Sequence, residues 1–362
     1  MLRITQSKSA QQAKSYYVGG LSREEYYSEG QEVAGNWQGN GAERLGLAGK
    51  VDQEAFYALS ENRDPDTGAR LTARTKDDRT VGYDFNFHVP KSVSAMYAHT
   101  GDERIVAALR AAVGDTMREI ETEMQTRVRV GGAQEERTTG NIVYAEFVHK
   151  TARPVDGKPD PHLHAHCFVF NATYDTVEER WKAGYFRDLK RDAPYDEAAF
   201  HARLANNVKE LGYEVEAKGR FWEIEGVPQS VIDKYSQRRD QIEALAEKRG
   251  ITDPAAMDKL GASSREKKVK LSMEQLSAEW ASRLTPEEKA AMEAARVGGR
   301  GKQTGKDGVG LPVQQALDHA LDHVFERVLC SALVSGDAER LAGITAADEV
   351  DGGNSVMMKS PC

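Results

Sequence analysis

Three histidines alternate with small or apolar residues in the stretch DPHLHAHCFVFN, residues 160–171. Because side chains in a β-strand repeat every second residue on one face, we expect His162, His164 and His166 to share a face. A preceding apolar stretch, TTGNIVYAEFVHK, reads as a second strand and ends at His149 and the lysine after it. Imidazole nitrogens are ligands for divalent metals, and three of them with open coordination positions suit a Lewis acid. The pattern therefore predicts a metal site.

The chain between these two strands predicts their register. A hairpin that turns at Asp156-Gly157 places His149 directly opposite His164, and Asp-Gly is a favoured dipeptide for a tight turn. Residues opposite each other have Cβ atoms ~5 Å apart, and His166 would lie diagonally to His149. The connecting segment also contains three prolines, which cannot all donate to a ladder, so we expect its outer part to be irregular: Pro154, Pro159 and Pro161.

Two tyrosine pairs lie near the N-terminus in SYYVGGLSREEYY, which contains Tyr16, Tyr17, Tyr26 and Tyr27. The first pair ends a short helical pattern closed by Gly19-Gly20. The second follows Ser22 and Glu25, whose spacing is that of a capping box at a helix start. A pair of this kind commonly has one tyrosine in the core and one half exposed. A phenol can also act as a nucleophile in covalent catalysis, although its pKa of ~10 requires activation.

The remaining pattern predicts an α+β protein. Strict alternation in TVGYDFNFHVP predicts a half-buried strand, with Val81, Tyr83, Phe85 and Phe87 on one face and Asp84, Asn86 and His88 on the other. We expect short helices in the first 30 residues, turns over 36–50 and a helix over 91–128 that is interrupted near Gly101. Beyond these, the sequence predicts a helix over 196–212, a hairpin within 213–226 and charged helices from about 228 to 297.

Composition narrows the class of protein. The chain has 362 residues, 40% of them hydrophobic, which is enough for one large or two smaller cores. A net charge of −8 argues mildly against non-specific coating of nucleic acid. The three cysteines are too few and too scattered for a disulfide framework or a thiolate zinc site. With no signal peptide and no long apolar run, we expect a cytoplasmic protein.

Taken in order, four stretches resemble one family: the tyrosine pairs, NWQGNGAERLGL, DFNFHVPKSVS, and TTGNIVYAEFVHK with DPHLHAHCFVFN. They resemble the relaxase domain of the MobF-type conjugative relaxases, the TrwC and TraI kind, from residue 1 to about 300. The resemblance implies an HUH endonuclease fold, in which an antiparallel palm sheet is flanked by helices and a charged helical extension closes over DNA. It implies a palm over 1–230, a DNA-clamping extension over 231–300, and a flexible linker, one helix and a tail over 301–362.

The resemblance also assigns the site. The family's metal triad falls on His149, His164 and His166, its acidic residue on Asp84, its nicking tyrosine on Tyr16 and a second active tyrosine on Tyr26. His162 is then an extra histidine. Asp84 could accept the tyrosine proton or orient a ligand histidine. We expect the cofactor to be a divalent ion, Mg²⁺, Mn²⁺ or Zn²⁺. The other histidines are expected to be ordinary ones: His88, His99, His201, His319 and His323.

The implied reaction is site- and strand-specific nicking and strand transfer at an origin of transfer, through a 5′-phosphotyrosine, to initiate conjugation in a bacterial cytoplasm. The substrate would be single-stranded or hairpin DNA. Expected partners are relaxosome accessory proteins and a coupling protein; since the chain has no Walker motif, we also expect a separate helicase or a truncation. Basic and aromatic residues that could contact DNA are Arg70, Arg74, Lys76, Trp181, Lys182, Arg187, Lys190 and Arg191.

Three other functions fit parts of the pattern. A rolling-circle replication initiator or an HUH transposase would use the same metal and tyrosine chemistry at a different DNA site. A tri-histidine zinc hydratase or hydrolase of small molecules would explain the histidines and leave the tyrosine pairs without a role. A non-catalytic DNA-binding autorepressor would need neither Tyr16 nor a metal.

Overall fold

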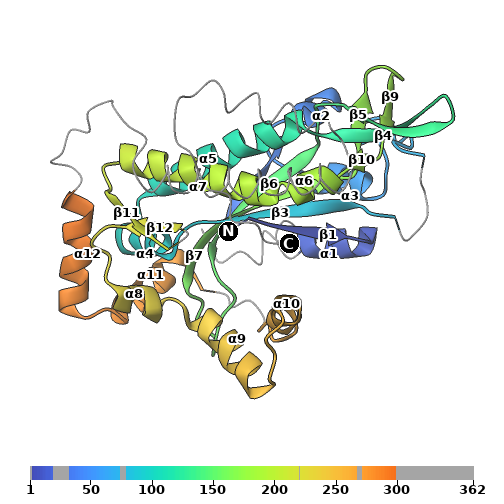
Figure 1. The fold of residues 1–362 in the computed structure, drawn as a ribbon. Helices are drawn as coiled ribbons and strands as arrows, with labels where there is room; N and C mark the ends of the chain where they lie inside the picture. Colours follow the sequence, from blue (N-terminus) through green and yellow to red (C-terminus); the bar gives the residue numbers. More distant parts are fainter. Residues whose placement is uncertain (1, 19–31, 74–78, 220, 267–270, 299–362) are drawn as a thin grey trace, which may run out of the picture.

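A five-stranded antiparallel sheet forms the centre of the computed structural model, which describes residues 2–18, 32–73, 79–219, 221–266 and 271–298 (Figure 1). The strand order is β1-β3-β7-β6-β2. The five strands, in that order, are Leu2–Ser7, Gly82–His88, Pro161–Phe170, Tyr144–Thr151 and Glu32–Gln38. Every neighbouring pair is antiparallel. The expected α+β class with an antiparallel sheet flanked by helices is confirmed.

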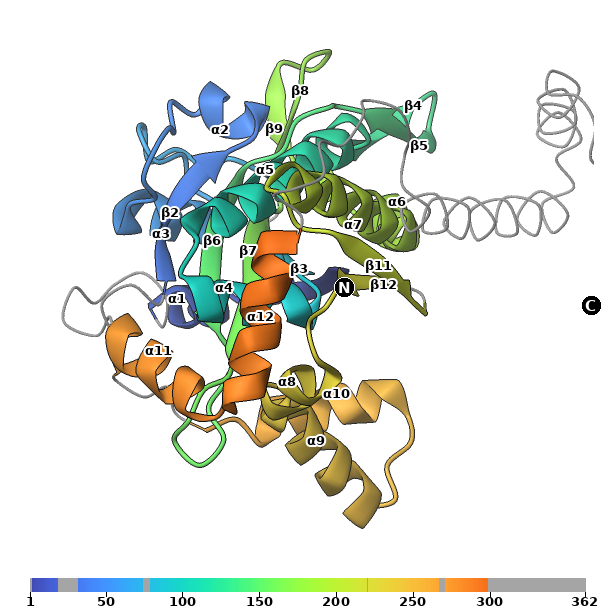
Figure 2. The same ribbon diagram turned by 90° about the vertical axis from the view of Figure 1, so that its left-hand side faces the viewer.

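One face of the sheet is covered by helices that pack over its length (Figures 1 and 2). They are α5 (Glu103–Thr122) and α7 (Ala193–Glu210), which lie side by side, and the shorter α4 (Lys91–Thr100). The apolar side chains of β3 point towards this face, because Phe85 and Phe87 are fully buried in the same cluster as residues of the helices. The expected face is therefore confirmed for Tyr83, Phe85 and Phe87 but was wrong for Val81, which precedes β3 and is buried with Phe168 and Phe170 instead. The polar half of β3 faces away from the helices.

The opposite face is covered in part by α1 (Ala10–Val18), α2 (Asn40–Arg44) and α3 (Gln53–Ser60). Aromatic side chains from the sheet and from α3 pack there around Phe56, whose ring lies 5.5 Å from that of Phe168 and 4.9 Å from that of Phe170. Ala13 of α1 is buried in this second cluster. By the two-residue repeat of β7, the residues that share this face with Phe168 and Phe170 are the alternating histidines.

The helix expected over 91–128 is interrupted as predicted but ends earlier. Gly101 has a left-handed backbone (φ 62°) that closes α4, and Asp102 caps α5. The chain leaves the helix after Thr122 and continues as the strand β4 (Gln125–Val130), which pairs with β5 (Ala133–Thr138). The prediction of helix up to residue 128 was wrong, because QTRVRV alternates and buries Thr126 and Val128 on one side of a strand.

The sequence pattern missed two edge strands of the sheet. β1 begins the chain where only short helices were expected, and β2 occupies residues before and into the predicted turn region 36–50. Packing explains why β2 forms, since Trp37 is buried and pairs in register with Ala145 of β6. The expected hairpin within 213–226 is confirmed as β11 (Val215–Lys218) and β12 (Phe221–Ile224).

Short strands and one short helix connect the sheet to α7. They are β8 (Thr173–Asp175), β9 (Arg180–Lys182), β10 (Gly184–Tyr185) and α6 (Arg187–Arg191). β8 and β9 form a hairpin, and β10 adds to the edge of β4. Figure 1 shows these strands gathered at one end of the molecule, near β4 and β5.

The charged region after residue 228 is helical, as expected. It contains α8 (Gln229–Lys234), α9 (Gln237–Lys248), α10 (Pro254–Ser263), α11 (Met273–Ser282) and α12 (Pro286–Gly298). Val231 of α8, Trp280 of α11 and Met292 of α12 are buried in the same cluster as residues of α4, so these three helices share the main core. The domain boundary at residue 230 and the DNA-clamping role stay predictions, and residues 301–362 lie outside the described part of the chain. Among the helices that the structure describes, none has the length and apolar character needed to cross a membrane.

Candidate active site

The hairpin of β6 and β7 has the register that the sequence predicted. His149 pairs directly with His164. Asp156 and Gly157 have positive φ angles of 51° and 74°, and Val155 and Lys158 exchange backbone hydrogen bonds across them. The turn is thus a two-residue turn at the predicted dipeptide. A register shift after His149 confirms that the outer part of the hairpin is irregular.

Three imidazoles converge on the face of the sheet opposite the main core. The ring centroids of His149, His164 and His166 are 5.1, 4.9 and 5.0 Å apart. One ring nitrogen from each lies within 4.8 Å of the others, so the group could hold a metal ion. His164 is 8% exposed, and His149 and His166 are half-buried.

Hydrogen bonds on the far side of two rings orient this triangle. Nδ1 of His166 donates to the carboxylate of Asp84, with 2.9 and 3.1 Å to its two oxygens. Nδ1 of His164 lies 2.9 Å from the backbone carbonyl oxygen of His162. Both contacts place the proton on Nδ1 and leave Nε2 as the ligand atom, which is the usual arrangement around a metal-binding histidine. The donor set therefore fits a divalent metal with open positions.

A second group of imidazoles adjoins the first through His164. Because β3 lies on the other side of β7 from β6, His88 pairs directly with His164. Nδ1 of His88 lies 2.9 Å from Nε2 of His162, and one ring nitrogen from each of His88, His162 and His164 falls within 4.8 Å of the others. Burial holds the pKa of His88 and of His162 well below the usual value, so both are neutral near pH 7.

From the sequence alone, His88 is expected to be an ordinary histidine and His162 an extra one, whereas the structure brings both against His164. The alternation in β3 had already placed His88 on the face of Asp84, which was the available signal. Asn86 lies between them on the same face, opposite His166. Its buried Oδ1 has no hydrogen-bond partner among the residues that the structure describes.

The C-terminal helices contact residues 159 and 160, which lie immediately before β7. Nε1 of Trp280 donates to the carbonyl oxygen of Pro159 at 2.8 Å, and Arg283 forms an ion pair with Asp160 at 2.6 Å. Lys91 of α4 donates to the carbonyl oxygen of Pro161 at 3.0 Å, and burial lowers its pKa to about 8. The sequence pattern had not indicated these contacts, because they join residues up to 123 positions apart.

The predicted nucleophiles are only partly described by the structure. Tyr16 lies on α1, whose backbone is described, but its side chain falls outside the described part, and Tyr26 lies outside it altogether. α1 packs against α3 and β1, and its Ala13 is buried in the cluster that includes Phe168. The helix that carries Tyr16 therefore lies over the same face of the sheet as the histidines.

The predicted DNA contacts fall into several places. Arg74 and Lys76 lie outside the described residues, and Arg70 is exposed in the loop after α3. The ring of Trp181 packs on that of Tyr174 at 5.6 Å. The other three predicted contacts are on α6. Nζ of Lys190 lies 5.9 Å from the centre of the Tyr83 ring, and the side chains of Arg187 and Arg191 are exposed.

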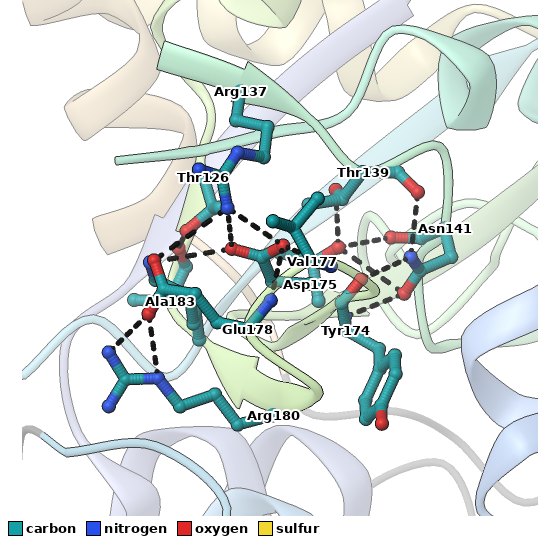
Figure 3. Close-up of polar contacts among 12 residues, drawn as sticks. Thr126, Arg137, Thr139, Asn141, Tyr174, Asp175, Val177, Glu178, Arg180 and Ala183 are labelled. Atoms are coloured by element: carbon teal, nitrogen blue, oxygen red, sulfur yellow. Dashed lines mark hydrogen bonds and ion pairs between the residues drawn. The ribbon is translucent and has the colours of Figure 1, made fainter. Parts of the chain in front are cut away.

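Lys182 lines a cleft of about 550 Å³ between the β8–β9 hairpin and β4. Three further cations line it that were not among the predicted DNA contacts: Arg127, Arg129 and Arg180. The hairpin is held in place by Asp175, which accepts hydrogen bonds from Arg137 and from its own turn at Val177, while Asn141 bonds the backbone of Tyr174 (Figure 3). The cleft is thus lined mostly by basic side chains, two of which, Arg180 and Lys182, pair with Glu178 of the same lining.

Comparison with known proteins identifies the family. The TrwC relaxase family matches residues 10–286 of this sequence. The chain belongs to the TrwC relaxase family. A curated relative from Escherichia coli (strain K12), the multifunctional conjugation protein TraI, is 35% identical over 295 residues, which cover 77% of this chain and 16% of the relative. Another TraI from Escherichia coli is 34% identical over 353 residues, 90% of this chain and 19% of the relative. This relaxase chain spans less than a fifth of these relatives.

Solved structures of the conjugative relaxase TrwC share the fold. A metal-free complex with oriT DNA has a TM-score of 0.68 and 28% identity, and covers 81% of this chain and 98% of the other. A metal-bound complex with oriT DNA has a TM-score of 0.68 and 30% identity, with the same coverage. A complex with a 27-mer DNA comprising the recognition hairpin and the cleavage site has a TM-score of 0.66, with 28% identity over 82% of this chain and 98% of that one. The expected relaxase fold is confirmed.

Proposed function

We propose that this relaxase nicks one DNA strand at an origin of transfer and passes that strand on, which starts conjugative transfer of a mobile element. The observation that carries the proposal is the triangle of His149, His164 and His166, oriented by Asp84, in a chain of the TrwC family. The histidine face also lies beneath the helix that carries Tyr16. Neither a small-molecule hydrolase nor an autorepressor would need that arrangement.

The ligands of the metal are proposed to be His149, His164 and His166. A divalent ion held there would withdraw charge from the non-bridging oxygens of the scissile phosphate. The side chains of this site are all imidazoles, which suit zinc, copper and nickel better than magnesium. We therefore expect Zn²⁺ to bind more tightly than Mg²⁺, while water and phosphate oxygens would complete the coordination of Mg²⁺ or Mn²⁺.

Asp84 is proposed to position His166. Both of its oxygens lie within hydrogen-bond distance of Nδ1 of His166. This geometry favours the orienting role over the role of proton acceptor for the tyrosine, because a carboxylate so placed stabilises the ligand tautomer. Of the two roles left open by the sequence, orientation of His166 is therefore the better supported.

The nucleophile is proposed to be the phenol oxygen of Tyr16. As it loses its proton it bonds to the scissile phosphorus, and the bond from phosphorus to the 3′ oxygen breaks. The products are a 5′-phosphotyrosine and a free 3′-hydroxyl. Since one phosphodiester replaces another, the step is reversible and needs no ATP. Tyr26 is proposed as a second nucleophile that acts while Tyr16 remains esterified.

The substrate is proposed to be single-stranded DNA with an adjoining hairpin, as in the TrwC complexes. The basic cleft lined by Arg127, Arg129, Arg180 and Lys182 is a surface that could hold phosphates. Relaxosome accessory proteins, a coupling protein and a helicase supplied separately belong to the same proposal. The proposal also includes a cytoplasmic location. It further assigns the relaxase palm to residues 1–230 and a DNA-clamping extension to residues 231–300.

The experiment that tests the proposal uses an oligonucleotide labelled at its 3′ end that spans the transfer origin of the element encoding the chain. A denaturing gel should show a covalent protein–DNA adduct that requires a divalent metal and disappears after chelation. An oligonucleotide from the replication origin of the same element should give none. Full adduct formation after thorough chelation, or adduct formation only on the replication origin, would contradict the proposal.

A further inference from the structure

Five histidines lie side by side on three neighbouring strands, more than one metal centre needs. His88 is on β3, His149 is on β6, and His162, His164 and His166 are on β7 between them. The strand registers place His164 opposite His149 on one side and opposite His88 on the other. His164 is therefore the middle member of two groups of three.

The group on the β3 side has the contacts of a built site. The ring of His88 stacks on that of His164 at 5.3 Å with an interplanar angle of 12°, and the rings of His162 and His164 are 4.7 Å apart. A single hydrogen bond of 2.9 Å joins Nδ1 of His88 to Nε2 of His162. This hydrogen bond keeps two imidazole nitrogens close together, and the three rings could hold a metal ion once ring rotation turns those nitrogens from each other towards it.

The chemistry of the side chains indicates the kind of ion. All three are imidazoles, which suit transition metals such as zinc, copper and nickel better than magnesium or calcium.

We propose that His88, His162 and His164 form a second position for a divalent transition metal such as Ni²⁺, which competes with the position of His149 and His166 for the shared His164. Because Nδ1 of His164 is engaged by the carbonyl oxygen of His162, His164 offers a single ligand nitrogen. The two positions are then mutually exclusive, and an ion at one removes a ligand from the other. The position takes its metal whether or not the chain nicks DNA.

The test measures the affinity and stoichiometry of Ni²⁺ by calorimetry on chain without any polyhistidine tag. The double variant His149→Ala with His166→Ala leaves only His164 in the first group and keeps the second intact. It should bind one Ni²⁺ with an affinity within about tenfold of the wild type. Adding His88→Ala, or instead His162→Ala, should weaken that binding at least tenfold. The wild type should bind one Ni²⁺ and not two, because His164 is shared.

The matched control adds His99→Ala to the same double variant. His99 lies outside both groups, 3.6 Å from Glu293, and its loss should leave Ni²⁺ affinity unchanged. If the double variant fails to fold, the single variant His166→Ala with and without His88→Ala makes the same comparison. Ni²⁺ binding that does not respond to His88→Ala or His162→Ala would overturn the proposal, and so would two ions bound to the wild type. Either result would leave metal-dependent nicking, measured separately, untouched.

Discussion

The carboxylate of Asp84 on β3 lies against Nδ1 of His166 on β7, with its two oxygens 2.9 and 3.1 Å away. The two residues are not directly opposite each other, because Asp84 pairs with Phe168 and His166 pairs with Asn86. The contact is therefore diagonal across the ladder. It holds the imidazole with Nε2 turned towards His149 and His164, so Asp84 acts on the metal site through a ligand.

We expect Asp84→Asn to lower the affinity for Zn²⁺ about tenfold to a hundredfold, the usual cost of removing a carboxylate behind a ligand histidine. Calorimetry with Zn²⁺ measures it, and nicking should fall in parallel at limiting metal. Asp188→Asn is the control, since Asp188 forms a surface ion pair with Arg191 away from the site. Unchanged zinc affinity together with lost nicking would instead assign Asp84 to proton transfer.

We expect Tyr16→Phe to abolish the covalent adduct on supercoiled plasmid, because the phenol oxygen is the attacking atom. Tyr26→Phe should keep the first nick and impair the second strand transfer. Tyr17→Phe and Tyr27→Phe are the matched controls and should keep most of the activity. A normal amount of adduct from Tyr16→Phe, with the linkage mapped to Tyr26, would reverse the two roles.

The sequence predicted the part of the site that lies on β6 and β7, because that part depends on local signals. A two-residue period put the histidines on one face, and Asp156-Gly157 set the register that brings His149 to His164. Sequence order does not say which strand lies on the other side of β7, so the pairing of His88 with His164 came only from the sheet. The same holds for β1 and β2, whose places depend on tertiary packing.

A missed strand shows a second limit. The run after α5 kept enough helix-forming residues to read as helix, yet Thr126 and Val128 turn inward with a period of two. The pairing of β4 with β5 and β10 outweighs the local preference. As a result Arg127 and Arg129 of the basic cleft were absent from the predicted DNA contacts, although Lys182 of the same cleft was among them.

The stability of α12 should depend on pH through Glu288. Its carboxylate accepts from Lys234 at 2.6 Å, from Ser230 at 2.7 Å and from the backbone of Thr285 at 2.8 Å. The hydrogen bond from Lys234, followed by that from Ser230, lowers the pKa of Glu288 to about 2 from 4.5. A carboxyl whose pKa is lower in the folded state stabilises the fold fully above its unfolded pKa and loses that effect as the pH falls.

We therefore expect the urea midpoint to fall between about pH 4.5 and pH 2, and Glu288→Gln to remove part of that fall. Glu247→Gln on the exposed side of α9 is the control and should preserve the wild-type slope. Parallel curves for Glu288→Gln and the wild type would show that other carboxyl groups carry the whole effect.

The ion pair between Arg283 and Asp160 should join the C-terminal helices to the metal site. Its side chains are 11% and 2% exposed, and Asp160 lies two residues before His162. Removal of the arginine leaves a buried carboxylate without its partner, which typically costs ~3–5 kcal/mol. We expect Arg283→Ala to lower the free energy of unfolding by about that amount, measured by urea denaturation.

The matched control is Arg239→Ala, which breaks an exposed i,i+4 pair with Glu243 and should cost only ~0.3–0.5 kcal/mol. Metal affinity separates a purely structural role from a positioning role. If Arg283 positions β7 through Asp160, zinc binding should weaken in Arg283→Ala under conditions where the variant remains folded, and Arg239→Ala should bind zinc as the wild type does. Loss of stability with unchanged zinc affinity would confine Arg283 to holding the helices, because the histidine triangle would then keep its geometry without the C-terminal contact.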